Sequence, residues 1–169
     1  MIGDRWGVTD AEVARRYPCD ELVRDPVLRA WRGVTVCARP DEVWRWVAQI
    51  RLAPYSYDLI DNLGRRSPQQ LQALPEPVAG ERFTTALGGR RYGRIEAVSS
   101  GHELTATIMG AHMSYVLVPI DDGRHTRLLL KVVARGNRVI ARVLCIGDLV
   151  MARRQLLNLA ALAERDTAR

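Results

Sequence analysis

Between Gly80 and Gly136 the sequence alternates between apolar and polar residues with a period of two, and this run restricts the possible folds more than any other feature. Period two is typical of β-strands, and short turns rich in Gly, Ser and Asp separate the alternating segments. The sequence therefore predicts an antiparallel meander. Its expected strands are Arg82–Leu87, Gly93–Val98, Glu103–Met109, Met113–Pro119 and Thr126–Arg135.

The last of these strands shows how the two faces of the sheet should differ. Leu128, Leu130 and Val132 point one way, whereas Arg127 and Lys131 point the other way. Antiparallel sheets commonly bury one face and leave the other in water. We therefore expect one dry and one wet face, although the alternation in the earlier strands leaves open which residues face inward.

Segments with other patterns lie on both sides of the meander. Leu28–Arg39 is rich in Val, Thr and Trp and is expected to form a first strand. Pro40–Ile50 has helical spacing, with a proline in its first turn, and Tyr55–Leu63 is predicted to be a second, short helix. After Asn137 the chain is predicted to be one long helix. A bend or break is expected at Gly147, with Asp148 capping the second half, because glycine is disfavoured inside helices.

This order of elements predicts an α+β fold in which a curved antiparallel sheet of about six strands wraps around the long C-terminal helix. Such a sheet does not close completely on a helix, so an apolar cavity is expected between them. The 169 residues suit a single domain, 1–169, in which 1–27 form an N-terminal helical extension.

Composition excludes several classes of function. The net charge of +6 comes from arginines scattered in pairs, whereas nucleic-acid binding needs basic residues gathered on one face. The three cysteines and three histidines lack the spacing of metal ligands or of disulfide frameworks. Without a signal peptide or an apolar stretch of roughly 20 residues, the sequence predicts a soluble cytoplasmic protein with no membrane span, no cofactor and no nucleic-acid partner.

Short motifs along the chain resemble the SRPBCC superfamily, which includes START-like, Bet v 1-like and polyketide-cyclase-like domains. The similar motifs are Trp6-Gly7-Val8-Thr9, Tyr17-Pro18-Cys19-Asp20, Ala38–Trp44, Tyr55-Ser56-Tyr57-Asp58, Asn62–Pro68 and Gly147–Arg154. The resemblance implies a helix-grip fold around an apolar cavity, and the arginine-rich composition suggests an actinobacterial branch. Leu59 replaces a tryptophan that is common in this group, and the resemblance supplies no catalytic residues.

Two groups of residues are candidates for binding a ligand. Tyr55, Tyr57 and Asp58 cluster beside an apolar helix, and residues three apart share a helix face, so Tyr55 and Asp58 could point together into the cavity. The alternative is that the tyrosines plug the cavity while Asp58 caps a helix or pairs with an arginine. Three further residues could line the inner wall: Tyr115, Met109 and Met113.

The sequence thus favours a protein that binds a small hydrophobic ligand, such as a lipid or a polyketide, in an internal cavity. A cofactor-free cyclase or dehydratase that uses Tyr and Asp groups in the same cavity is the alternative. A stress or interaction protein without a bound small molecule is a third hypothesis. The sequence identifies neither the ligand nor the oligomeric state.

Overall fold

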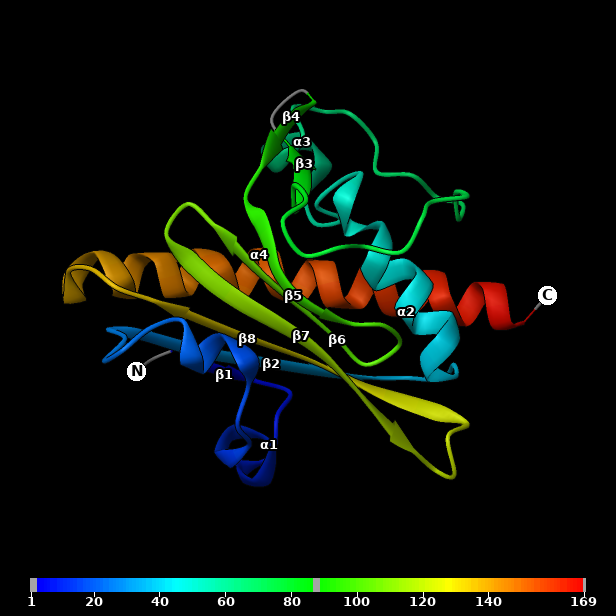
Figure 1. Ribbon diagram of the computed structural model, residues 1–169, viewed down its shortest axis with the longest axis horizontal. Helices are drawn as coiled ribbons and strands as arrows, with labels where there is room; N and C mark the ends of the chain where they lie inside the picture. The colour runs from blue at the N-terminus through cyan, green and yellow to red at the C-terminus, as the bar shows by residue number, and fades with distance from the viewer. Residues whose placement is uncertain (1–2, 87–88, 169) are drawn as a thin grey trace.

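A six-stranded sheet and a long C-terminal helix form the framework of the structure (Figure 1). The computed structural model describes residues 3–86 and 89–168, and it describes their side chains except in 138–148. The strand order is β1-β2-β8-β7-β6-β5. These elements are β1 (Arg5–Trp6), β2 (Leu28–Val36), β5 (Arg94–Ser99), β6 (Glu103–Ile108), β7 (Ala111–Ile120), β8 (His125–Ala134) and α4 (Arg138–Thr167).

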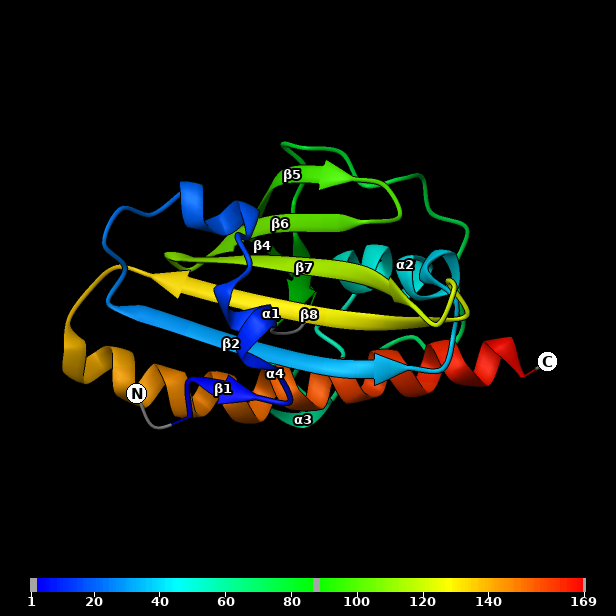
Figure 2. The same cartoon turned by 90° about the horizontal axis from the view of Figure 1, so that it is seen from below.

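Long antiparallel pairings hold the centre of the sheet together. The register of β2 on β8 runs from Leu28 opposite Ala134 to Val36 opposite Thr126. Figure 2 shows these strands side by side, with α4 running along the sheet. The helix has 30 residues, which corresponds to about 45 Å. The expected α+β fold with an antiparallel sheet against the C-terminal helix is therefore confirmed, and the short edge strand β1, which pairs in parallel with β2, is an addition to it.

The remaining elements are short and connect the framework. They are α1 (Asp10–Ala14), η1 (Pro18–Glu21), α2 (Pro40–Ala48), η2 (Gln49–Arg51), α3 (Asp58–Asp61), β3 (Thr84–Ala86) and β4 (Arg90–Tyr92). Helix α2 begins at a proline, carries Asp41 and Glu42 in its first turn and buries its apolar face, as expected.

The strand expected at Arg82–Leu87 does not join the main sheet. Thr84–Ala86 form β3, which pairs with β4 alone among the described strands, in a separate two-stranded ribbon, and Leu87 lies outside the described residues. Gly93 separates this ribbon from β5 and has a φ of +67°. A Cβ atom at this position would lie 2.4 Å from the carbonyl oxygen of Thr107, so the close approach requires glycine. The chain changes direction at Gly93, and the alternating pattern therefore belongs to two sheets.

The main core lies between the inner face of the sheet, α2 and α4. Leu128, Leu130 and Val132 of β8 are buried in it together with Leu156 and Leu159 of α4. The side of β8 that was expected to be dry therefore faces the C-terminal helix.

The opposite face of the sheet was expected to be wet, and this expectation is wrong for its central part. Tyr17 and Cys19 from the N-terminal segment pack there on Trp31, Leu129 and Val133 in a second buried cluster. In Figure 1 the N-terminal segment with α1 lies on the opposite side of the sheet from α3. The sequence contained the signal, because Leu129 and Val133 interrupt the polar alternation of β8.

Lys131 is buried within this second cluster rather than exposed. Its ammonium group lies 2.6 Å from a carboxylate oxygen of Asp20 and about 5 Å from two aromatic rings, 5.1 Å from the Tyr17 centroid and 4.9 Å from that of Trp31. A buried lysine requires such a partner, because an isolated charge is expensive to bury. The ion pair thereby fixes the N-terminal segment on the sheet.

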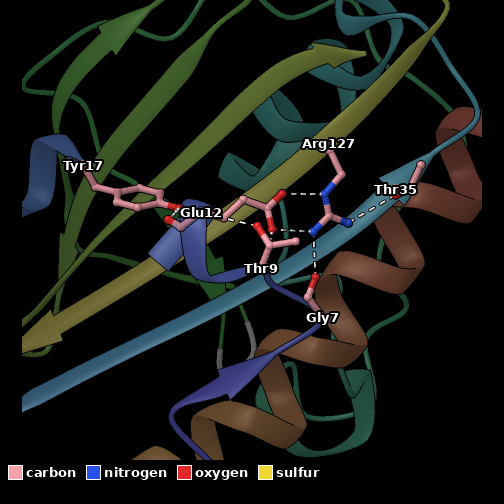
Figure 3. A network of polar contacts seen from close by, with 6 residues as sticks. All are labelled: Gly7, Thr9, Glu12, Tyr17, Thr35 and Arg127. Atoms are coloured by element: carbon pink, nitrogen blue, oxygen red, sulfur yellow. Dashed lines mark hydrogen bonds and ion pairs between the residues drawn. The ribbon is translucent and has the colours of Figure 1, made fainter. Parts of the chain in front are cut away.

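A second polar network fixes the same segment at Arg127 (Figure 3). The Arg127 Nε donates to Glu12 Oε1 at 2.8 Å, and its Nη2 donates to the Gly7 carbonyl at 2.6 Å. The Tyr17 hydroxyl donates to the Glu12 carbonyl at 2.8 Å. Hydrogen bonding from Arg127 holds the pKa of Glu12 below its ordinary value, and the partial burial of the carboxylate opposes this effect.

The expected break in the C-terminal helix does not occur. Helix α4 continues through Gly147 from Arg138 to Thr167, and Figures 1 and 2 show it running along the sheet without interruption. An internal glycine costs about 1 kcal/mol relative to alanine. This cost is small for a helix that packs along β2 and α2, so one glycine does not end it. The expected capping by the Asp148 side chain lies outside the described residues.

Candidate functional site

An apolar cavity of about 210 Å³ lies between the inner face of the sheet and α4. Leu130 and Val132 of β8 form part of one wall, and Ala152 of α4 forms part of the opposite wall. The short side chain of Ala152 leaves room that a larger residue would fill. The other lining residues are Ile50, Pro54, Ser56, Asp61, Phe83, Thr84, Ile108, Met113, Tyr115, Met151 and Gln155.

Tyr115 and Gln155 form a polar band across the cavity. The Tyr115 hydroxyl donates to Gln155 Oε1 at 2.7 Å, and Gln155 Nε2 donates to the Pro54 carbonyl at 2.6 Å. Both side chains are buried. The band therefore connects β7, α4 and the segment before α3, and it places a satisfied phenol and a satisfied amide beside otherwise apolar walls.

Asp61 and Ser56 provide a second polar group in the same cavity. The Ser56 hydroxyl donates to Asp61 Oδ2. The other oxygen, Asp61 Oδ1, is buried and has no hydrogen-bond partner among the described residues. Burial is the main cause that raises the pKa of Asp61, and the nearby Asp58 raises it further, whereas the Ser56 hydroxyl lowers it. Because buried polar atoms are normally paired, this oxygen is a free acceptor for a donor that enters the cavity.

The residues expected to line the inner wall are placed in two different ways. Met113 and Tyr115 of β7 lie in the cavity wall. Met109 is instead 90% exposed at the turn between β6 and β7, with a φ of +49°. Met109 does not line the cavity, because Met109 and Gly110 form a tight turn after β6. The sequence pattern had predicted that the strand continues through Met109.

Tyr55, Tyr57 and Asp58 are not gathered at the polar end of this cavity. They line a larger groove of about 600 Å³ between α3 and α4, on the other side of the segment 55–61. The expected helix over Tyr55–Leu63 begins only at Asp58, and Tyr55 has a φ of +56°. The argument from helical spacing therefore fails at this site. The turn brings Ser56, rather than the tyrosines, to the cavity wall.

Tyr55 and Asp58 have local structural roles, whereas Tyr57 is partly exposed. Tyr55 is 1% exposed, and its hydroxyl accepts a hydrogen bond from Gln49 Nε2 at 2.6 Å. Its burial raises its pKa to about 12. Tyr57 is 39% exposed. The Asp58 carboxylate accepts from the backbone N–H of Ser67 at 2.8 Å, so it fixes the loop that follows α3.

Sequence reasoning missed Asp61, Ser56, Gln155 and Ala152. Asp61 follows Asp58 by three residues in the same motif, so its presence near the cavity could have been considered. Gln155 could have been found as a polar residue on the buried side of α4. No local pattern indicates that Asp61, rather than Asp58, is the carboxylate that faces the cavity.

The described part of the chain also bears on metal binding and on membrane crossing. No group of three His, Cys, Asp or Glu side chains is placed there to hold a metal ion. None of the described helices is both long and apolar enough to cross a membrane.

Comparison of sequences finds no match to a described protein family and no match among curated proteins. Comparison of structures finds the same fold in several bacterial proteins. MLL2253 from Mesorhizobium loti is 19% identical with a TM-score of 0.57, and the match covers 81% of this chain and 97% of that protein. NE0264 from Nitrosomonas europaea is 13% identical with a TM-score of 0.56, and the match covers 86% of this chain and 100% of that one.

A third similar structure carries a descriptive name. The Polyketide_cyc-like protein Cgl2372 from Corynebacterium glutamicum is 11% identical with a TM-score of 0.53, and the match covers 86% of this chain and 96% of that protein. These identities are low, so the likeness concerns the fold. The fold is therefore the helix-grip fold of polyketide-cyclase-like proteins.

Proposed function

We propose that this protein binds a small hydrophobic ligand that carries a hydrogen-bond donor, in the cavity between the sheet and α4. The observation that carries this proposal is the unpartnered Asp61 Oδ1 in a mostly apolar lining whose other polar groups already have partners. Binding sites of this kind combine hydrophobic walls with a few placed polar groups. A ligand hydroxyl that donates to Asp61 would satisfy the oxygen, while its hydrocarbon part contacts Leu130 and Val132.

The volume of the cavity limits the ligand. Pockets for drug-sized molecules usually measure roughly 300–1,000 Å³, whereas this cavity measures about 210 Å³. The ligand that fits without rearrangement is therefore of the size of one or two fused rings. A longer lipid or polyketide would extend beyond the cavity.

A second candidate function is favoured by the protonation behaviour of Asp61. A carboxylate whose pKa is raised by burial is a stronger base than one in water and can act as a general base or acid. In a cofactor-free cyclase or dehydratase, Asp61 would take a proton from carbon in an activated substrate. Hydrogen–deuterium exchange at the central carbon of a bound aryl β-diketone, followed by NMR, tests this reaction, and Asp61→Asn should abolish the exchange above the rate in buffer.

The binding proposal is tested with two probes that differ by one hydroxyl. We expect 2-naphthol to bind saturably, with a fluorescence change, and naphthalene to bind about tenfold or more weakly, because a hydrogen bond to a charged group contributes about 1.5–3 kcal/mol. Asp61→Asn should remove most of this difference while leaving the affinity for naphthalene unchanged. Equal affinity of the wild type for both probes would contradict the role of Asp61.

A cavity-filling substitution tests the location of the site. Ala152→Met places a longer side chain in the cavity, and it should weaken the binding of both probes at least tenfold. Ala161→Met is the matched control, because Ala161 lies on the same helix but lines the outer groove. If both variants bind 2-naphthol as the wild type does, the ligand lies elsewhere. Native mass spectrometry of the purified protein would then identify the bound metabolite.

A further inference from the structure

Three large apolar side chains are exposed together at α3. Leu59, Ile60 and Leu63 are 82%, 64% and 65% exposed, respectively. We refer to these three residues as the α3 tip. Single exposed apolar residues are common on protein surfaces and need no explanation, but a cluster of them indicates an interaction site.

The surrounding contacts hold the α3 tip in this orientation. Asp58 is fixed by hydrogen bonds from Ser67, and the side-chain amide of Asn62 is buried and donates to the Arg65 carbonyl at 2.7 Å. Leu63 has a φ of +51°, a left-handed conformation that is unfavourable for a bulky residue. Glycine or asparagine usually occupies this position after a helix. The structure thus places a leucine in water at a position that disfavours it.

Basic residues lie beside the α3 tip, and further apolar residues lie in a neighbouring groove. Arg66 and Arg154 line the groove between α3 and α4, and Arg153 lies next to Arg154 on the exposed side of α4. Val150 and Leu157 of α4 are 48% and 37% exposed, and they line a neighbouring groove that shares Tyr57 and Arg154 with the groove between α3 and α4. Asp58 carries a negative charge in the same groove, but the three arginines that line it, Arg66, Arg154 and Arg165, outnumber this carboxylate. The exposed surface therefore combines hydrocarbon with positive charge.

We propose that the α3 tip and its flanking arginines dock on an anionic lipid surface. Interfacial membrane binding needs only a few inserted apolar side chains together with basic residues near the lipid headgroups. A stable protein partner would require a larger apolar area, because a typical interface uses roughly 20–30 residues from each side. Three projecting side chains flanked by guanidinium groups match the chemistry of an anionic bilayer better than that of a protein surface.

The α3 tip and part of the cavity wall belong to the same short segment of the chain. The segment 54–61 contributes Pro54, Ser56 and Asp61 to the cavity wall and Leu59 and Ile60 to the outer surface. One segment therefore separates the cavity from the proposed lipid surface. A protein docked in this way would present its cavity next to the membrane, where hydrophobic metabolites accumulate. Docking itself does not depend on which ligand the cavity takes.

Sedimentation with sucrose-loaded vesicles tests the proposal. We expect the wild type to bind vesicles of phosphatidylcholine with 30% phosphatidylglycerol at least tenfold more tightly than vesicles of pure phosphatidylcholine. Replacement of the three tip residues by serine (Leu59→Ser, Ile60→Ser, Leu63→Ser) should weaken this binding at least tenfold. Each of Arg66→Gln and Arg154→Gln should weaken it about fivefold, since one basic residue near an anionic membrane contributes about that factor.

A matched control separates docking from general surface hydrophobicity. Val78 is 58% exposed and lies in a loop outside this surface, so Val78→Ser should bind vesicles as the wild type does. Equal vesicle binding by the wild type and the triple serine variant would overturn the proposal, as would the absence of any preference for anionic lipid. If light scattering shows a dimer that the triple variant converts to a monomer, the surface belongs to a second copy of the chain and the proposal is also overturned.

Discussion

Replacement of Asp61 by asparagine should stabilise the folded protein at neutral pH. The carboxylate is partly buried, and its Oδ1 lacks a partner among the described residues. Burial raises the pKa of Asp61, which means that the folded state favours the protonated form. A group of this kind contributes most to stability below its ordinary pKa of 3.8, and this contribution is lost as the pH rises through the raised pKa of the folded state. At pH 7 the charged side chain therefore destabilises the fold.

The magnitude follows from the charge on the unpaired oxygen. A buried unsatisfied group costs about 1–3 kcal/mol, and more when it is charged. Asparagine keeps an acceptor for the Ser56 hydroxyl and leaves a neutral amide in place of the unpaired oxygen, so it removes only the excess cost that belongs to the charge. We expect Asp61→Asn to raise the free energy of unfolding by about 1 kcal/mol at pH 7. For a chain of 169 residues this corresponds to an increase in Tm of about 3 °C.

Urea unfolding at several pH values checks both the sign and the cause. The difference between the variant and the wild type should be largest at pH 7 and should shrink as the pH falls through the raised pKa of Asp61, because the wild-type side chain then becomes protonated. A loss of stability at pH 7 would refute the reasoning, since it would show that the Asp61 carboxylate is a structural cap. A gain that does not change with pH would show that the charge is not the cause.

Two other predictions test the roles assigned to neighbouring and distant residues. Tyr55→Ala should lower the free energy of unfolding by about 3–5 kcal/mol, because Tyr55 is 1% exposed and packs edge-on against Trp46. Tyr57→Ala should change it by less than about 1 kcal/mol, because Tyr57 is 39% exposed. Equal effects of the two variants in denaturant unfolding would contradict this difference. Glu12→Gln should lower the free energy of unfolding by about 1 kcal/mol at pH 7. The difference from the wild type should vanish as the pH falls below 4.5 through the lowered pKa of Glu12. Glu21→Gln is the control and should be neutral, because the ion pair of Glu21 with Arg16 is exposed. A pH-independent loss for Glu12→Gln would show that its charge is not involved.

The sequence predicted the sheet well because strand periodicity is a local property. The alternation in β5 to β8 depends only on which side chains face the core, and the short turns between these strands force antiparallel neighbours. The C-terminal helix was found for a similar reason. The predicted break at Gly147 failed because helix propensity is a weak local term, and the packing of α4 along the sheet outweighs it.

The candidate site was predicted less well because it depends on a few backbone angles. The cluster of Tyr55, Tyr57 and Asp58 was noticed, and the cavity does lie beside that segment. The left-handed conformation of Tyr55 then decides which residues turn inward. No alternation or spacing encodes that angle, so Ser56 and Asp61 could not be distinguished from their neighbours. Gln155 contributes from a helix 101 positions after Pro54, and such long-range pairs are invisible to local patterns.

The segment from Pro54 to Gly64 reverses the usual distribution of side chains in a folded protein. Its inward side presents a carboxylate with an unpaired oxygen to an apolar cavity, and its outward side presents Leu59, Ile60 and Leu63 to water. Both arrangements are unfavourable for stability, and exchanging polar and apolar residues would relieve them. Local costs of this kind usually persist where they serve function.

Because the two costs fall on opposite sides of the same short segment, the Asp61→Asn and α3 tip variants can be combined to ask whether ligand binding and lipid docking are coupled. If α3 moves when the α3 tip enters a bilayer, anionic vesicles should change the affinity for 2-naphthol in the wild type and should leave it unchanged in the triple serine variant.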